Sequence, residues 1–379
     1  MGSRGSRLVR QGPASASAEE QRCSFHLRVF LMSSERPRAL VTGGAGFIGS
    51  ALVAELIDAG WTVAVLDTLS YAAAPGTIAL LKQLDHCTLV KGDIRDRHAV
   101  RNAFKLADPD VIFHAAAETH VDRSIDAATD FVTTNVIGTF ELLEAARDWR
   151  DTYPERKVTF VHVSTDEVFG DLHDTGQFDE ASPYAPSSPY SATKASSDHL
   201  VRAWARTYGL DVRISNCSNN YGPRQFPEKL IPLTILNALE GKPLPVYGDG
   251  GQVRDWLYVN DHARALRLIA EKGEASRTYC VGGNAEQTNL NVVYLLCDIL
   301  DERIEKPDSH RELITFVSDR PGHDRRYAID ASRIKAELGW RPGQTFQAGL
   351  KKTVDWYLAH EDWWRPLAQH YKRERLGNI

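Results

Sequence analysis

Short apolar runs alternate with stretches of helical spacing through the first half of the chain. In the helical stretches apolar residues recur three to five positions apart, as Phe47, Leu52 and Leu56 do. The runs between them are continuously apolar, which is typical of strands buried on both faces of a sheet. The predicted strands lie at residues 39–42, 61–66, 88–90, 110–114, 158–163 and 212–216. The predicted helices lie at residues 46–59, 97–106, 128–148 and 190–208.

This alternation of strands and helices predicts an α/β fold. Right-handed crossovers between such elements build a Rossmann-type, doubly wound parallel sheet. From Asn219 onward proline and glycine cluster, and we expect loops and short elements over the carboxyl ends of the strands. We therefore predict a Rossmann domain over residues 35–218 and a smaller α/β substrate-binding domain over residues 219–379. Some segments of the second domain are expected to return to the main sheet.

Residues 1–34 differ in character from the rest of the chain. The first 18 residues contain Arg4, Arg7, Arg10 and four serines, with no acidic residue. They show no apolar period, so they do not read as an amphipathic targeting peptide. We expect a flexible leader there, with Met32 as the natural start of the functional protein.

Composition narrows the class of protein. The chain has 379 residues, of which 42% are apolar and 25% charged, as in ordinary globular proteins. A net charge of −5 lacks the basic footprint of a nucleic-acid binder. No apolar run reaches the roughly 18 residues of a membrane-spanning helix, so we expect no membrane partner. The five cysteines form no CxxC pair, which predicts no metal site and reduced thiols in the cytoplasm.

A glycine cluster follows the first predicted strand and opens the first helix. Residues 43–49, GGAGFIG, have the spacing GxxGxxG, which suits a tight turn with a pyrophosphate at the helix N-terminus. Asp67 ends the second strand, where a carboxylate binds ribose hydroxyls and repels a 2′-phosphate, which favours NAD over NADP. Asp93 ends the third strand, in a place suited to the adenine. An alternative role for Asp67 is that of an N-cap or turn residue.

Two further patterns carry chemistry. Tyr190 and Lys194 form a YxxxK pair on one face of a predicted helix, where an ammonium group is expected to lower the pKa of the phenol. Thr165, just past the fifth strand, completes a Thr–Tyr–Lys set. With the glycine loop, this set resembles the short-chain dehydrogenase/reductase superfamily of the extended type.

Two acids directly follow this threonine. Asp166 and Glu167 can be held in different protonation states, one as an acid and one as a base. Elimination of water needs both, because a base must take a carbon-bound proton and an acid must protonate the departing hydroxide. A simple dehydrogenase or epimerase needs no such pair. The alternative is a solvated turn with two surface acids.

Longer motifs restrict the resemblance to one family within this superfamily. Residues 162–170 (HVSTDEVFG), 188–199 (SPYSATKASSDH), 216–223 (NCSNNYGP) and 226–232 (FPEKLIP) resemble the dTDP-glucose 4,6-dehydratase family, as do residues 254–259 and 320–327. The resemblance covers about residues 38 to 360. One departure is Phe169, where the family usually has tyrosine, and we expect this aromatic exchange to be tolerated.

The resemblance implies a reaction in three steps. Tyr190, helped by Lys194 and Thr165, removes the O4 proton of the sugar while hydride passes from C4 to NAD⁺. Glu167 takes the C5 proton and Asp166 protonates the departing C6 hydroxyl. The hydride then returns to C6, so the cofactor ends as it began.

The resemblance also implies binding residues and partners. We expect the substrate to be a nucleotide sugar, dTDP-glucose, and the assembly to be a homodimer that pairs the helices at 128–148 and 190–208. An alternative for Arg254 is a salt bridge with Asp255 or Asp261. The cofactor residues are Gly43, Gly46, Phe47, Ile48, Gly49, Asp67, Asp93, Ile94, Ala115, Ala117, Thr119, Tyr190 and Lys194. The substrate residues are Asn219, Glu228, Lys229, Pro245, Tyr247, Arg254, Asn289 and His323.

Alternatives remain open at this point. A UDP-glucose 4,6-dehydratase would share the acid pair, which does not separate dTDP from UDP. An epimerase or a decarboxylase would not need that pair. A non-catalytic NAD-binding sensor could keep the fold alone, but it would need none of the five catalytic residues.

Overall fold

Seven strands form the central sheet, in the order β10-β6-β5-β4-β1-β2-β3, and all neighbours are parallel. This computed structural model describes residues 1–2, 36–319 and 322–370, so the predicted leader lies outside the described residues from residue 3 on. The predicted doubly wound sheet is confirmed. The strands are β1 (Arg38–Thr42), β2 (Thr62–Asp67), β3 (Cys87–Lys91), β4 (Val111–His114), β5 (Thr159–Thr165), β6 (Asp211–Cys217) and β10 (Thr278–Val281).

The strand order reverses beside β1. The chain runs outward from β1 through β2 to β3, and then crosses back to place β4 on the other side of β1. At such a point, the connections that follow two adjacent strands run to opposite sides of the sheet. The result is a crevice at the carboxyl ends of β1 and β4, where open α/β sheets bind their ligands.

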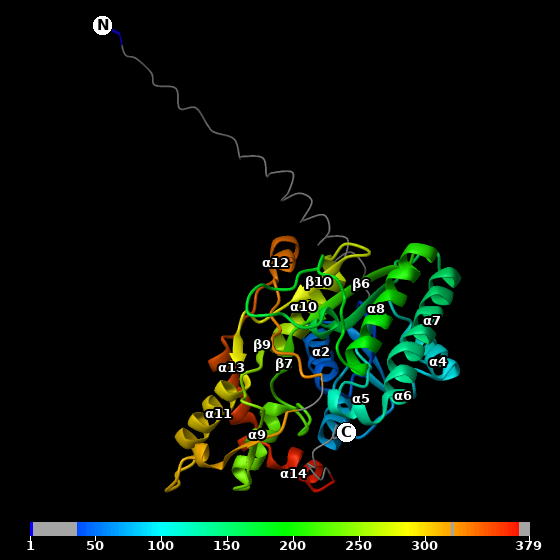
Figure 1. Ribbon diagram of the computed structural model, residues 1–379. Helices are drawn as coiled ribbons and strands as arrows, with labels where there is room; N and C mark the ends of the chain where they lie inside the picture. Colours follow the sequence, from blue (N-terminus) through cyan, green and yellow to red (C-terminus); the bar gives the residue numbers. More distant parts are fainter. Residues whose placement is uncertain (3–35, 320–321, 371–379) are drawn as a thin grey trace. The chain divides into compact units, whose positions relative to one another are not determined.

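Helices cover both faces of this sheet. They are α2 (Phe47–Asp58), α3 (Pro75–Gln83), α4 (Arg97–Ala107), α7 (Gly138–Thr152), α8 (Pro189–Tyr208) and α10 (Val259–Lys272). Because side chains alternate along a strand, Val41 packs into one core with α2 and α10, whereas Leu40 packs into the other with α4, α7 and α8. Figure 1 shows α7 and α8 side by side on the same side of the sheet.

The long helix predicted at residues 128–148 contains an irregularity. After α5 (Val121–Asp126), α6 (Ala128–Phe131) continues through a π-helical turn, η1 (Val132–Ile137), into α7. A π-turn accommodates one extra residue in the helix and often marks a functional site. This turn carries Asn135, which is buried.

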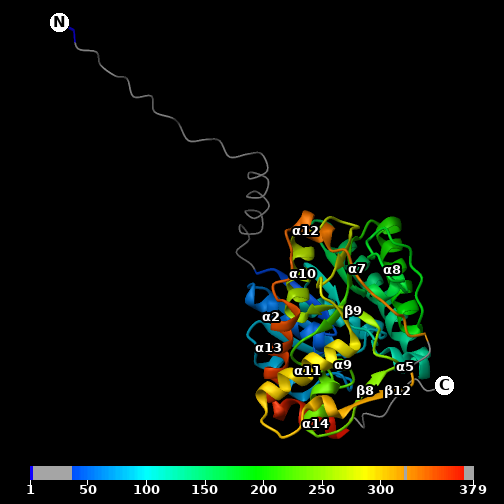
Figure 2. The ribbon, with the colours of Figure 1, turned by 60° about the vertical axis from the view of Figure 1, so that its left-hand side comes forward.

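The chain beyond residue 218 is more regular than expected. Instead of only loops and short elements, it contains helices of 14 and 15 residues, α10 and α11. The apolar face of α10 is buried against the sheet, and that of α11 is buried in a separate core. The remaining elements are η2 (Asp166–Phe169), β7 (Asn219–Tyr221), α9 (Leu230–Leu239), β8 (Leu244–Tyr247), β9 (Val253–Tyr258), β11 (Glu286–Thr288), α11 (Asn289–Arg303), η3 (His310–Leu313), β12 (Ile314–Val317), α12 (Ser332–Leu338), α13 (Phe346–Ala359) and α14 (Glu361–His370). Figure 2 shows α11 beside α9.

Residues on both sides of the predicted boundary share one core. β10 pairs with β6 in the main sheet, and Leu257, Leu266 and Tyr279 pack in the same cluster as Val41. The division at residue 218 stays a prediction. Among the described helices, none has both the length and the apolar character that crossing a membrane requires.

Candidate active site

The glycine cluster forms the turn between β1 and α2. Gly43 has a φ of +71°, and a Cβ there would lie 2.7 Å from the backbone of Ala116. A Cβ on Gly49 would lie 2.1 Å from the carbonyl oxygen of Gly43. No side chain caps the N-terminus of α2 at Gly46, so its backbone N–H groups remain for an anion. This cradle admits close approach of a pyrophosphate and therefore fits a dinucleotide.

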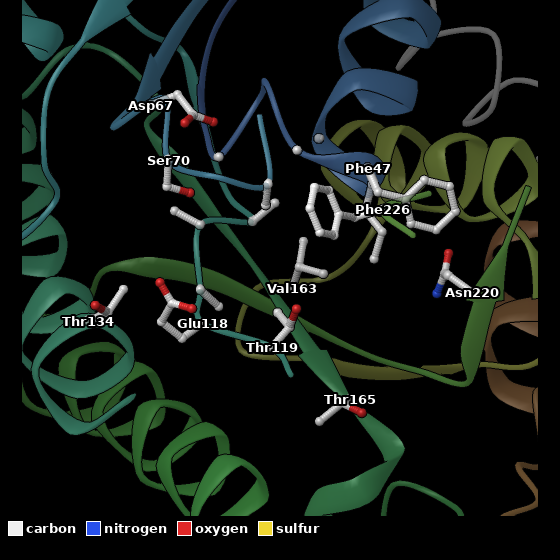
Figure 3. A pocket seen from close by; sticks show the side chains of 18 of the residues that line it. Phe47, Asp67, Ser70, Glu118, Thr119, Thr134, Val163, Thr165, Asn220 and Phe226 are labelled. Carbon is white, nitrogen blue, oxygen red and sulfur yellow. The ribbon is translucent and has the colours of Figure 1, made fainter. Parts of the chain in front are cut away.

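Asp67 joins the end of β2 to the glycine turn. Its Oδ2 accepts a hydrogen bond of 2.9 Å from the N–H of Ala45, and its Oδ1 accepts one of 2.8 Å from the N–H of Leu69. Burial raises the pKa of this carboxyl, and the two hydrogen bonds act in the opposite direction. Asp67 is thus a turn residue that also lines the cavity, as Figure 3 shows, so its two predicted roles are compatible.

All the predicted cofactor residues line one cavity over the carboxyl ends of the strands. Asp93 lies at its rim, where the Arg95 guanidinium lowers the pKa of the carboxyl. In Figure 3, Asp67 and Thr165 lie far apart along this cavity, with Val163 and Thr119 between them. The lining includes Gly43, Gly46, Phe47, Ile48, Gly49, Asp67, Asp93, Ile94, Ala115, Ala117, Thr119, Tyr190 and Lys194.

The acid pair follows directly from the end of β5. Thr165 is the last residue of that strand and the N-cap of η2, and it accepts a hydrogen bond of 3.3 Å from the N–H of Glu167. Its hydroxyl donates a hydrogen bond of 3.2 Å to Oδ1 of Asp166. All three residues line the same cavity as the glycine turn.

The two acids have different environments. Asp166 is 1% exposed, whereas Glu167 is only half-buried. Burial, followed by the neighbouring charge of Glu167, raises the pKa of Asp166 well above its usual range. Oδ2 of Asp166 is buried and has no hydrogen-bond partner among the described residues. The arrangement suits Asp166 to hold a proton that it can donate.

Tyr190 and Lys194 lie in the first turns of α8. A capping box between Ser188 and Ser191, with Pro189 at the first helical position, begins this helix. The i, i+4 spacing brings both side chains to the cavity. The helix start that the sequence predicted at residue 190 is therefore accurate to one residue.

The expected lowering of the Tyr190 pKa by Lys194 stays a prediction, and burial shifts this pKa in the opposite direction. Burial raises the pKa of Tyr190 well above its usual range, although a hydrogen bond with Thr165 lowers it. The Lys194 ammonium donates to the carbonyl of Val163 at 2.8 Å, and its Nζ lies 3.4 Å from Nε2 of His162. Burial is the larger effect because the phenol is only 7% exposed.

A buried polar group lies beneath Lys194. Nε2 of His162 lies 3.1 Å from Oδ1 of Asp198, which is fully buried. The other carboxylate oxygen accepts hydrogen bonds from Ser164 at 2.9 Å and from Tyr184 at 2.7 Å. This carboxylate offsets part of the cost of burying the ammonium, yet burial still lowers the pKa of Lys194 to about 8.

The predicted substrate residues divide into two groups. Asn219, Glu228 and Lys229 line the cavity. Arg123 approaches Glu228 at 3.3 Å, and Lys229 donates to the carbonyl of Thr119 at 2.9 Å. The other five, Pro245, Tyr247, Arg254, Asn289 and His323, are not among the residues that line this cavity, and their roles stay predictions.

Contacts of three of these five residues, Arg254, Tyr247 and His323, can be described. The Arg254 guanidinium donates to the carbonyls of Val253 and Asp324 and lies 4.4 Å from the centre of the Tyr327 ring. The ring of Tyr247 lies 6.3 Å from that of His323. Arg254 also lowers the pKa of Asp166, which places its charge near the acid pair.

Sequence reasoning missed several residues of the site. Asn135, in the π-turn, holds the backbone of Glu118 through two hydrogen bonds and donates a third, of 2.9 Å, to Thr193 on α8. Periodicity gives no sign of a π-turn, so this link had no signal. Phe226 stood within a quoted motif but had no assigned role. The missed lining residues include Ser70, Tyr71, Glu118, Thr134, Asn220, Gln225 and Phe226.

Comparisons with known proteins agree with this geometry. A family profile described as GDP-mannose 4,6 dehydratase matches residues 40–353. The chain is 56% identical to a probable dTDP-glucose 4,6-dehydratase of Sinorhizobium fredii, over 90% of this chain and 98% of that protein. It is 53% identical to a dTDP-glucose 4,6-dehydratase of Salmonella typhimurium, over 86% and 94% of the two chains. A crystal structure of DesIV, a dTDP-glucose 4,6-dehydratase of Streptomyces venezuelae with NAD and TYD bound, superposes with a TM-score of 0.80 at 46% identity, over 87% and 99%.

Proposed function

Because the chain belongs to the dTDP-glucose 4,6-dehydratases, we propose how its own residues divide the reaction of that family. The enzyme is an NAD-dependent hydro-lyase that converts dTDP-glucose into dTDP-4-keto-6-deoxyglucose and water. One observation carries the division of roles: Thr165, Asp166 and Glu167 line the same cavity as Tyr190, Lys194 and the glycine turn.

The glycine turn and Asp67 hold NAD. The uncapped N-terminus of α2 binds the pyrophosphate, and Asp67 binds the ribose hydroxyls with the lone pairs that Ala45 and Leu69 leave unused. When bound, NAD accepts a hydride from C4 of the sugar and later gives it to C6. The protein supplies the binding, the orientation and the proton transfers.

Tyr190 is the base of the first step. Its phenolic oxygen takes the proton of the O4 hydroxyl, and the hydrogen bond with Thr165 helps to stabilise the phenolate. Lys194 adds a positive charge held in place by the Val163 carbonyl. The new 4-keto group then makes the neighbouring C5 proton acidic.

The acid pair performs the elimination. Glu167 takes the C5 proton as the base. Its side chain is half-buried, whereas that of Asp166 is buried. Asp166 keeps its proton because of its burial and delivers it to the departing C6 hydroxyl, and its Oδ2 has no hydrogen-bond partner among the described residues. Two carboxyl groups in unequal environments thus act as base and acid at one pH.

The remaining substrate residues bind the nucleotide in this proposal. Arg254 and His323 meet the diphosphate, Asn219 and Asn289 donate from their amides, and the base lies near Tyr247 and Pro245. A guanidinium group suits bidentate contact with phosphate oxygens. In this proposal residues 219–379 form most of the nucleotide-sugar site, and residues 35–218 supply the cofactor site and the catalytic residues.

We also propose a homodimer in the cytoplasm. Val132 and Ile137 in η1 are 48% and 45% exposed, and Tyr208 at the end of α8 is 41% exposed. These apolar side chains lie on the elements that the resemblance assigns to a dimer interface, where contact with a second copy would cover them. The cysteine usage supports the cytoplasmic location.

Parallel incubations test the function and the choice of nucleotide. The purified enzyme is mixed with dTDP-glucose in one reaction and with UDP-glucose in another, and the products are identified by mass spectrometry. We expect a 4-keto-6-deoxy product from dTDP-glucose. A product from UDP-glucose alone would reassign the base, and a 4-epimer with no loss of water would contradict the acid pair's role.

A further inference from the structure

One fully buried histidine, His262 on α10, has no role in the reaction described above. It is 0% exposed, and burial lowers its pKa to about 3, so its ring is neutral at neutral pH. Its Nδ1 lies 3.0 Å from Oδ1 of Asn220, and its Nε2 lies 3.4 Å from Oγ of Ser215. A neutral imidazole donates from one of its nitrogens and accepts at the other. The contacts of Asn220 decide which nitrogen carries the proton.

The side-chain amide of Asn220 is oriented by two further contacts. Its Nδ2 donates to the carbonyl of Ser218 at 3.0 Å and to Sγ of Cys217 at 3.3 Å. Because a carbonyl oxygen only accepts, the nitrogen of the amide must face Ser218 and the oxygen must face His262. His262 therefore carries its proton on Nδ1 and donates it to Asn220, while its Nε2 accepts from Ser215.

Asn220 lies at the catalytic end of the cavity. Its partner Cys217 is the last residue of β6 and the register partner of Thr165 at the end of β5. Asn220, Cys217, Thr165 and Tyr190 all line the cavity, and Figure 3 shows the side chains of Asn220 and Thr165. Both N–H protons of the Asn220 amide are given to the protein, so the capacity that remains is a second lone pair on Oδ1. Asn220 thus offers an acceptor to the N–H or O–H group of a ligand.

We propose that His262 is a positioning residue, which fixes the amide of Asn220 so that its Oδ1 accepts a hydrogen bond from the nicotinamide half of NAD. That half must lie at the catalytic end, because its ring exchanges hydride with a sugar whose O4 proton goes to Tyr190. Its carboxamide N–H and ribose O–H groups are suitable donors, whereas the pyrophosphate at the glycine turn has none. His262 itself contacts neither cofactor nor substrate in this role, which rests on the proposed placement of NAD.

The exchange rate of bound NAD tests this role. The holoenzyme is mixed with an excess of isotopically labelled NAD, and mass spectrometry follows the replacement of the bound cofactor. His262→Leu leaves Oδ1 of Asn220 without its donor and allows the amide to turn. We therefore expect NAD to exchange about threefold to tenfold faster than in the wild type, as for the loss of one hydrogen bond. His262→Asn, which supplies an amide N–H close to the position of Nδ1, should restore most of the wild-type rate.

A double variant distinguishes this positioning from a general structural role. Asn220→Ala alone should accelerate the exchange by a similar factor, and the addition of His262→Leu to it should have no further effect. His310→Leu is the matched control, because His310 is 2% exposed but does not line the cavity. This control should lower the melting temperature and leave the exchange rate unchanged.

Three results would overturn the role of His262. One is a wild-type exchange rate in His262→Leu, or in Asn220→Ala should His262→Leu fail to fold. The second is independent acceleration by the two substitutions. The third is a raised KM for dTDP-glucose without faster exchange, which would assign Asn220 to the sugar. If the wild-type protein holds no NAD, the proposed placement of the cofactor fails and this role with it, whereas failure of the role alone leaves that placement intact.

Discussion

At the scale of single residues, burial sets the protonation state of the groups that carry the chemistry. Asp166, Tyr190 and Lys194 are all nearly inaccessible to solvent. Loss of hydration disfavours the charged form of each group, so it raises the pKa of the acid and the phenol and lowers that of the amine. The sequence identified these residues, but burial could not be read from a YxxxK spacing.

Substitution of the proposed base separates the steps of the reaction. Glu167→Gln keeps the shape of the side chain but cannot take the C5 proton. We expect oxidation of the sugar to proceed and elimination to stop, so the near-ultraviolet absorbance of NADH should accumulate on mixing with dTDP-glucose. Glu155→Gln, an exposed position of the same type, is the matched control. Full turnover by Glu167→Gln would show that another group is the base.

The pH dependence of kcat/KM reports the charge on Lys194. Burial lowers its pKa to about 8, while the charge of Asp198 acts in the opposite direction. Because the ammonium form is the active one, kcat/KM should fall as the pH rises through about 8, in a profile measured from pH 6 to 10. A profile that stays flat through this range would contradict the assigned role.

The same lowered pKa has a consequence for stability. The unfolded value, 10.5, lies above the folded one, so between about 8 and 10.5 the unfolded chain binds more protons at this residue. The contribution of Lys194 to the unfolding free energy therefore rises with pH in this window. Lys194→Met should remove that rise. Denaturant unfolding of both proteins across this pH window measures the difference in their unfolding free energies.

At the scale of elements, apolar runs predicted the sheet because parallel strands are buried on both faces. β1 through β6 and helices α2, α4 and α8 lie where the pattern predicted them. The π-turn at Asn135 escaped prediction because periodicity over residues 128–148 indicates a helix but does not distinguish a single wider turn within it. Beyond residue 218 proline and glycine concealed α10 and α11, whose apolar faces meet partners distant in sequence.

The turn between β1 and α2 offers a test at this scale. In Gly49→Ala the new Cβ would lie 2.1 Å from the Gly43 carbonyl oxygen, which the turn cannot accommodate without moving. We expect a loss of about 1–3 kcal/mol of stability and much weaker NAD binding. Calorimetric melting and titration with NAD measure the two effects.

Gly60→Asn serves as the control for this substitution. Gly60 has a φ of +85°, which asparagine tolerates better than most residues, and a Cβ there meets nothing within 4 Å. Gly60→Asn should leave the stability and the NAD affinity nearly unchanged. If Gly49→Ala bound NAD like the wild type, the proposed cradle would be wrong.

At the scale of the whole molecule, the proposed dimer rests on exposed apolar residues. Ile137→Arg places a charge on the proposed interface, and light scattering after gel filtration should move from twice the chain mass of 42.3 kDa toward a single chain. Phe316→Arg, a similarly exposed apolar position on β12, should leave the mass unchanged. A wild-type mass of one chain would rule the dimer out.

The positions of the substrate-binding residues could not be predicted from the sequence. The resemblance indicated Arg254 and His323 as substrate residues, yet neither is among the residues lining the cavity that holds the catalytic set. Their positions depend on how β9 and the segment after β12 pack in space, which no local pattern encodes. The net charge of −5 describes the whole chain and gave no information about where the Arg254 guanidinium lies.

The fate of the C4 hydrogen tests the central claim most directly. The enzyme is given dTDP-glucose that carries deuterium at C4, and the product is analysed by NMR and mass spectrometry. Internal return of the hydride, with elimination by Asp166 and Glu167 in between, predicts that the deuterium appears in the C6 methyl group of the 4-keto-6-deoxy product. Deuterium released to water, or retained at C4, would contradict the account.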